Sequence, residues 1–142
     1  MKDILYQKEF VSLVLDDSIP AIYENWRGTA SRDEFKEALE HKLALYCQYK
    51  TTISDLHWIA NLKGLKVNQE AQAWANHDFH QKLYPSGIRK IAFIVPEGTL
   101  HLLDNEQLSS HLDIKKQIEL CYFDNMAEAS EWLQQVSLTQ NS

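Results

Sequence analysis

The sequence is poor in the residues that build specialised sites, with two cysteines, four glycines and three prolines among 142 residues. Cys47 and Cys121 lie far apart and match no metal-ligand spacing, so a disulfide framework is not expected. The few glycines leave no room for a glycine-rich phosphate loop, and no nucleophile elbow, Walker loop or H-E-x-x-H run occurs. We therefore predict a protein that is not an enzyme and needs no cofactor.

The sequence also lacks a basic cluster and a long hydrophobic run. Its formal net charge is -6, so nucleic acid is a poor partner. The N-terminus, MKDILYQKEF, is too polar for a signal peptide, and no stretch is long enough for a membrane span. A hydrophobic content of 44% is typical of a folded domain. These features predict one cytoplasmic domain over residues 1–142, with a disordered tail from about residue 137.

What is present is an alternation of strand-like and helical patterns. A hairpin is predicted from 4–15 and 19–26, with an extra short strand before Phe10 as an open alternative. A helix follows that begins with the capping-box pattern of Ser31 and Glu34. Further strands are predicted at 51–59, 88–96 and 118–123, and further helices at 68–84, 98–113 and 125–136. This order predicts an α/β fold with a mixed, mostly parallel sheet of four to five strands, an N-terminal hairpin and four helices.

The first predicted helix has one clear apolar face. Phe35, Leu39, Leu43 and Tyr46 recur at helical steps along it. Lys42 interrupts this face, and we expect its stem to lie along the surface with the ammonium group in water.

Candidate binding residues gather where the third predicted strand is expected to end. In open parallel sheets, ligands and partners meet the carboxyl ends of the strands. Trp58 and Trp26 are rigid, amphipathic side chains near such ends, although closing the core is the more common role for such residues. Lys63 and Lys66 make the loop locally basic. The predicted partner or ligand site comprises Asp55, Trp58, Asn61, Lys63, Lys66 and Asn68.

Other chemistry has less support in the sequence. His77 and His80 lie three residues apart on a predicted helix and would provide two metal ligands, but a typical site needs a third, so no metal site is predicted. Asp55 and Asp124 lie near strand ends, where they would act as an acid–base pair or, more commonly, as loop and helix caps. These residues keep open the alternative of a small cytoplasmic enzyme.

An ordered set of segments resembles the STAS/SpoIIAA-like family, in particular small bacterial domains of that kind. They are WRGTASRDEFKEAL, SDL, Trp74, GIRKIAFIVP and YFDNMAEASEWL. The resemblance implies a four- or five-stranded sheet with helices that serves as a regulatory or binding module. Related anti-sigma-factor antagonists switch through a phosphorylatable Ser or Thr at the start of the second helix.

This sequence departs from that switch. No Ser or Thr occurs between Asp55 and Asn68, and Asn68 occupies the expected helix cap. Because an amide cannot accept a phosphoryl group there, we predict a non-catalytic binding module without a phosphorylation switch. Its partner would be a protein or a small ligand, and homodimer formation stays open. A lipid or apolar ligand carrier is a further alternative.

Overall fold

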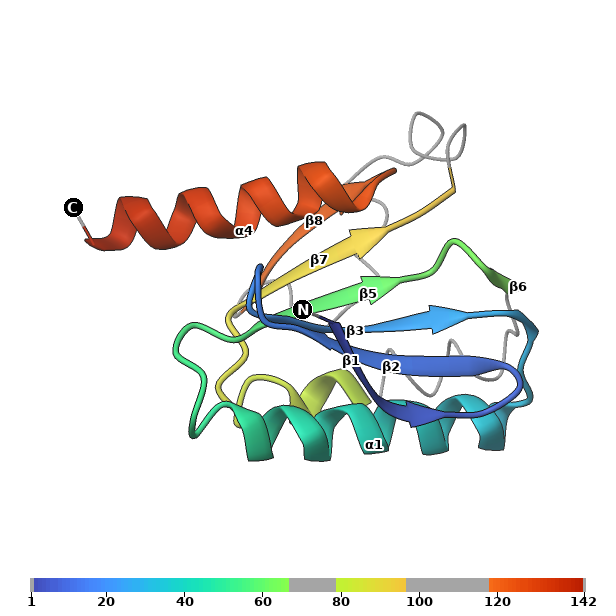
Figure 1. The fold of residues 1–142 in the computed structure, drawn as a ribbon. Helices are drawn as coiled ribbons and strands as arrows, with labels where there is room; N and C mark the ends of the chain where they lie inside the picture. Colours follow the sequence, from blue (N-terminus) through green and yellow to red (C-terminus); the bar gives the residue numbers. More distant parts are fainter. Residues whose placement is uncertain (1, 67–78, 97–117, 142) are drawn as a thin grey trace.

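The computed structural model describes residues 2–66, 79–96 and 118–141. These residues form an α/β fold in three layers (Figure 1). One central sheet lies between two helices, with α1 on one face and α4 on the other. The predicted fold class is therefore confirmed.

The central sheet is mixed, as predicted, but it has six strands instead of four or five. The first three strands pair antiparallel, and the others follow in parallel. The extra strand arises because the first apolar stretch divides at residues 8–10 into two strands. In their order across the sheet, the strands are β1 (Lys2–Gln7), β2 (Val11–Asp16), β3 (Ala21–Trp26), β5 (His57–Asn61), β7 (Lys90–Ile94) and β8 (Glu119–Phe123).

The described residues contain two α-helices, not the four that were predicted. α1 spans Arg32–Tyr49, and both hydrogen bonds of the Ser31–Glu34 capping box are present. α4 spans Met126–Asn141, and the Asn125 side chain caps it by accepting from the Glu128 amide at 2.8 Å. The predicted helix at 98–113 and most of that at 68–84 lie outside the described residues. Within the described residues 79–84, a 3₁₀ helix, η2, spans His80–Lys82. The disordered tail stays a prediction, although α4 extends past residue 137.

Each face of the sheet has its own core. Alternate residues of the strands point to opposite faces, so Ile22 and Trp26 pack towards α1 while Ala21 and Tyr23 pack towards the other side. On the second side, Ala129 and Leu133 of α4 are fully buried. The central strands are thus covered on both faces, which explains their continuous apolar sequences.

The predicted start of the strand at 51–59 is wrong, and the true start changes the edge of the sheet at which two candidate residues lie. Residues 51–56 form turns, and β5 begins only at His57. Asp55 has a positive φ of 57°, a left-handed conformation that ends any extended run. Asp55 and Trp58 therefore lie at the amino end of β5, not at its carboxyl end.

Candidate functional site

The carboxyl ends of β3 and β5 continue into a second, smaller sheet. β4 (Gly28–Thr29) and β6 (Leu65–Lys66) pair in parallel beyond the edge of the main sheet. β6 is visible at the end of the molecule towards which the arrows of β3 and β5 point (Figure 1). We call residues 61–66 the carboxyl-edge loop.

Backbone contacts fix this loop against β3. The Gly28 amide donates to the Gly64 carbonyl at 3.0 Å. A Cβ at Gly64 would lie 1.9 Å from the Trp26 carbonyl oxygen, a distance that no side chain tolerates. Gly64 is thus required for the close approach of two backbones.

The Asn61 side chain organises the start of the loop. Its Nδ2 donates to Asn25 Oδ1 at 3.1 Å, which joins the ends of β5 and β3. Its Oδ1 accepts from the Lys63 amide at 3.2 Å. Asn61 therefore shapes the loop, while Lys63 itself is exposed.

A buried ion pair lies beneath the middle of β3 and β5, on the α1 side. Lys42 Nζ is 2.8 Å from Glu24 Oε2 and donates a hydrogen bond to the Ile59 carbonyl at 2.6 Å. It also lies 4.0 Å from the centre of the Trp58 ring, a cation–π contact. Within the described residues, Glu24 Oε2 has no partner that meets the geometric criteria for a hydrogen bond, so its contact with Lys42 counts as an ion pair.

The expectation that Lys42 reaches water is wrong, because its side chain is 0% exposed and that of Glu24 only 1%. Burial raises the pKa of Glu24, whereas the charge of Lys42 and the Asn61 amide lower it. Burial likewise lowers the pKa of Lys42, and the Glu24 charge opposes this. Each ion compensates the desolvation of the other, so the pair belongs to the scaffold.

Neither tryptophan forms part of an exposed surface. Trp58 is 3% exposed and packs against Tyr46 and Phe79. Trp26 is 5% exposed and stacks on Phe35. Both tryptophans therefore close the core, which is the alternative role that the sequence left open for them.

The opposite, amino edge of the sheet carries a pocket of about 260 Å³. It lies where the C-terminal end of α1, the turns before β5 and the segment before β7 come together (Figure 1). We call it the amino-edge pocket. Its lining includes Tyr46, Lys50, Asp55, His57 and Arg89.

Asp55 and Asp124 do not form an acid–base pair. Asp55 precedes β5, and Asp124 follows β8, which runs in the same direction two strands away. The two carboxylates therefore lie at opposite edges of the sheet. Asp124 Oδ1 accepts from the Asn125 side chain at 2.8 Å, next to the cap of α4.

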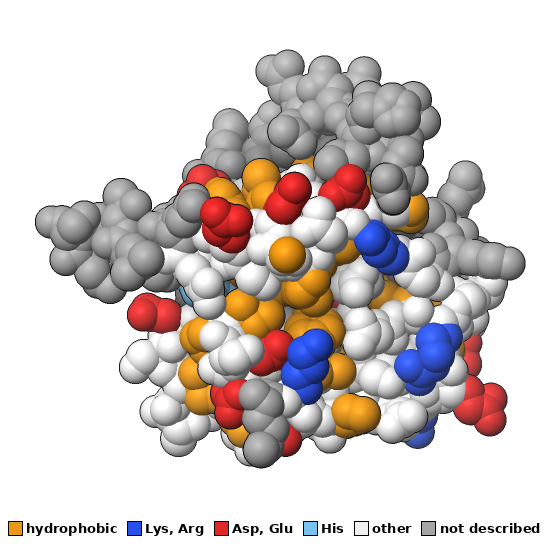
Figure 2. Space-filling view, turned by 45° about the horizontal axis from the view of Figure 1, so that its top comes forward, with side chains coloured by type: hydrophobic (Ala, Val, Ile, Leu, Met, Phe, Trp, Pro, Cys, Tyr) orange, Lys and Arg blue, Asp and Glu red, His pale blue; other side chains and the backbone are white. Residues whose placement is uncertain are grey.

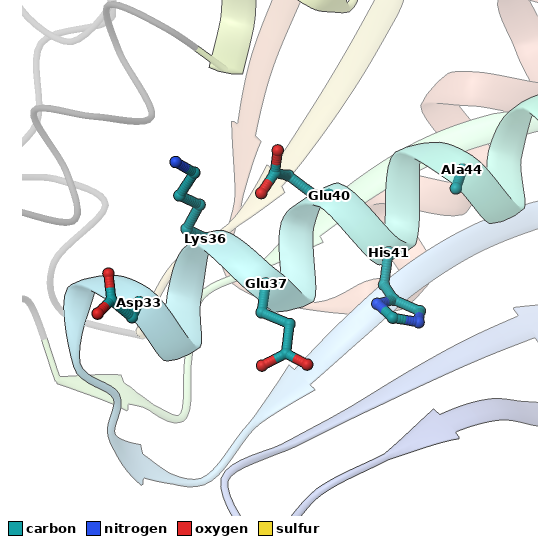
Figure 3. Close-up of a pocket in the computed structure, with 6 residues that line it drawn as sticks. All are labelled: Asp33, Lys36, Glu37, Glu40, His41 and Ala44. Atoms are coloured by element: carbon teal, nitrogen blue, oxygen red, sulfur yellow. The ribbon is translucent and has the colours of Figure 1, made fainter.

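A second hollow, of about 460 Å³, lies along the outer side of α1. All the side chains that Figure 3 draws come from that one helix, and they diverge: Lys36 and Glu40 point one way, and Glu37 and His41 the other. The hollow is larger than the amino-edge pocket, but its polar groups do not converge on one point. We therefore assign it no function.

Several candidate residues lie outside the described part of the chain, in whole or in their side chains. Asn68 and His77 lie outside the described residues, as do the side chains of Lys66 and His80. Within the described part of the chain, no three His, Cys, Asp or Glu side chains gather as metal ligands. The same residues include no helix long and apolar enough to cross a membrane.

The face turned forward in Figure 2 carries its Lys and Arg side chains apart from one another, with hydrophobic side chains between them. The described residues on this face therefore present no continuous basic surface of the kind that nucleic acid binding uses.

The sequence-based search missed Glu24, Gly64, Lys50 and Arg89. Glu24 carried a usable signal, because it falls on the inward-facing positions of its strand, between Ile22 and Trp26. A charged residue there, opposite Lys42 on the inward face of a helix, predicts a buried pair. Lys50 and Arg89 carried no such signal, since only the fold brings them together.

The three layers, the mixed sheet and the helix-covered faces define a STAS-like α/β domain. A family model described as SpoIIAA-like matches residues 21–134, from the start of β3 to within α4. The chain belongs to the SpoIIAA-like family, as its sequence predicted. STAS-like domains are often regulatory or binding modules and are generally non-catalytic. Neither the curated proteins nor the solved structures include a match to this chain.

Proposed function

We propose that this protein is a non-catalytic binding module that recognises a partner protein through the carboxyl-edge loop, residues 61–66. The observation that carries this proposal is the β4–β6 pair, which holds the loop beyond the main sheet. The neighbouring residue, Asn68, belongs to the same proposed surface. With no Ser or Thr between Asp55 and Asn68, recognition proceeds without a phosphorylation switch.

The rigidity of the loop supports a role in recognition. Asn61 ties its start to β3, and Gly64 lies directly against the Trp26 backbone. The Lys42–Glu24 pair lies beneath the middle of β3 and β5. A loop that is already ordered loses little conformational entropy when a partner binds, which favours affinity.

The charge of the loop indicates the kind of partner. Lys63 and Lys66 place two cations within a few residues on a chain whose net charge is -6. Charge complementarity raises association rates and excludes partners of the wrong sign. An acidic surface on the partner therefore fits this loop best.

The described polar groups support binding without catalysis. Glu24 and Lys42 neutralise each other inside the core, so neither reaches a substrate. Asp55 and Asp124 lie at opposite edges of the sheet. Among the described residues, Asp55 and His57 in the amino-edge pocket are the candidates that the enzyme alternative retains. A lipid carrier would need a wholly apolar cavity, whereas each of the two hollows described above has several charged side chains in its lining.

The test is affinity capture from lysate of the source organism with wild-type protein and with Lys63→Glu. The matched control is Lys82→Glu, because Lys82 is also exposed and has only a weak surface ion pair with Glu40 at 3.6 Å. Loss of one specific partner in Lys63→Glu, with its retention in Lys82→Glu, supports the proposal. Retention of every specific partner by Lys63→Glu contradicts it. If the partner is a second copy, light scattering will show a dimer that Lys63→Glu dissociates.

A further inference from the structure

We infer that the amino-edge pocket binds a small organic anion, with a phosphate or carboxylate group between Lys50 and Arg89 and an apolar body against Tyr46. This site is separate from the carboxyl-edge loop and lies at the opposite edge of the sheet. It would give the module a second, small-molecule input.

The pocket concentrates positive charge on an acidic protein. Lys50, Arg89 and Lys90 line it, against the single carboxylate of Asp55. Lys90 is paired with Glu119 at 3.4 Å, but within the described residues neither Lys50 nor Arg89 forms an ion pair with a carboxylate. Two cations are thus left for a ligand to neutralise.

The Arg89 guanidinium is held in place before any ligand arrives. Its Nη1 donates to the carbonyls of Tyr84 and Ile88 at 2.8 and 3.1 Å, and the group lies 3.6 Å from the Tyr84 ring centre. Among the described residues, Nε and Nη2 make no hydrogen bond. A fixed, planar group with free donors suits a phosphate or carboxylate.

Lys50, the C-cap of α1, also lines the pocket. Its Nζ donates to the Ser86 carbonyl and lies 6.0 Å from the Tyr46 ring centre. It also lies 3.5 Å from the place that a Cβ would take at Gly87, whose φ is +102°. Gly87 thus lets the backbone approach the ammonium group closely.

Part of the pocket lining is apolar and aromatic. Tyr46 and Trp58 pack with ring centres 5.8 Å apart, and Ile53, Leu56 and Ile88 also line the pocket. A volume of about 260 Å³ lies below the roughly 300–1,000 Å³ of drug-sized sites, so the ligand is small. An aromatic ring bearing one anionic group has the matching chemistry.

The test is an NMR titration of the intact chain with three probes: phenyl phosphate, benzoate and inorganic phosphate. We expect saturable shifts of the Lys50 and Gly87 amides with phenyl phosphate or benzoate, and the tighter of the two identifies the anionic group. Inorganic phosphate should bind more weakly, because it does not contact the apolar part of the lining. Binding of inorganic phosphate as tight as that of phenyl phosphate contradicts the apolar part of the site.

Variants locate the binding. Lys50→Met and Arg89→Gln should each weaken binding of the tighter probe about tenfold, since each removes a charge-assisted contact. Lys63→Gln removes the same charge at the other edge and should leave binding unchanged. Asp55→Asn should tighten binding, because it removes the opposing charge while asparagine tolerates the left-handed backbone. This variant still tests the site if Lys50→Met or Arg89→Gln fails to fold.

Absence of saturable shifts with all three probes overturns the inference. Equal weakening by Lys63→Gln and Arg89→Gln also overturns it, since that result means unspecific attraction to positive charge. Neither result bears on the carboxyl-edge loop, whose partner binding is measured separately.

Discussion

Lys42 and Glu24 form an ion pair inside the protein, with Nζ 2.8 Å from Oε2 and both side chains buried. Lys42 comes from α1 and Glu24 from β3, so the pair joins a helix to the sheet. Lys42 Nζ also donates a hydrogen bond to the Ile59 carbonyl, which extends the link to β5. This arrangement holds the strands from which the carboxyl-edge loop projects.

Removing one partner of this pair should destabilise the protein strongly. We expect Lys42→Met or Glu24→Met alone to lower the free energy of unfolding by about 3–5 kcal/mol, because each leaves an uncompensated buried charge. The double variant should lose much less than the sum, since two apolar side chains replace the pair. Urea denaturation of the four proteins measures this coupling. Additive losses would mean that the two charges do not depend on each other.

Gly64 should not accept a side chain. Its Cβ would clash with the Trp26 carbonyl oxygen, so Gly64→Ala must displace the loop, at a cost of about 1–3 kcal/mol for overpacking. The matched control is Gly28→Asn, because nothing lies within 4 Å of a Cβ there and asparagine tolerates its positive φ of 79°. NMR should show shifts across the carboxyl-edge loop in Gly64→Ala and only local shifts in Gly28→Asn. An undisturbed loop in Gly64→Ala would contradict the close approach.

His57 should make stability depend on pH. Its pKa lies below the usual 6.5, chiefly because burial disfavours the charged form; Asp55 raises the pKa and Lys90 lowers it further. Between the two pKa values the unfolded chain binds more protons than the folded one. His57 thus makes stability fall as pH drops below 6.5, until the folded pKa is reached.

The measurement is urea denaturation from pH 8 to pH 5, on wild type and His57→Gln. The variant should lose less stability over this range than wild type, because glutamine does not titrate. An NMR titration that places the pKa of His57 above 6.5 would reverse the sign and contradict the assignment. A bound anion in the amino-edge pocket should raise the pKa of His57, so the same titration in the presence of phenyl phosphate or benzoate also reports on anion binding.

Local patterns in the sequence predicted the fold well. The capping box at Ser31 and the Asn125 cap depend on neighbouring residues, so both could be recognised without tertiary information. The apolar runs gave the positions of β7 and β8 in the same way, and the continuous run of β7 also gave its burial. The family was also predicted, because an ordered set of segments carried the resemblance.

The site could be predicted only in part. The position of β5 was misjudged because Thr51, Thr52 and Ile53 have strand-like side chains but lie in turns. This error placed Asp55 and Trp58 at the wrong edge of the sheet. The burial of Lys42 depends on Glu24, eighteen residues earlier, and the amino-edge pocket depends on segments that only the fold brings together.

The most direct measurement of the central claim is hydrogen exchange of the protein with and without its captured partner. If the carboxyl-edge loop is the interface, the partner will slow exchange at the amides of residues 61–66 and of β4, and Lys63→Glu will abolish that protection. Protection confined to α4 or to the amino-edge pocket, with the loop exchanging as in the free protein, would contradict the account.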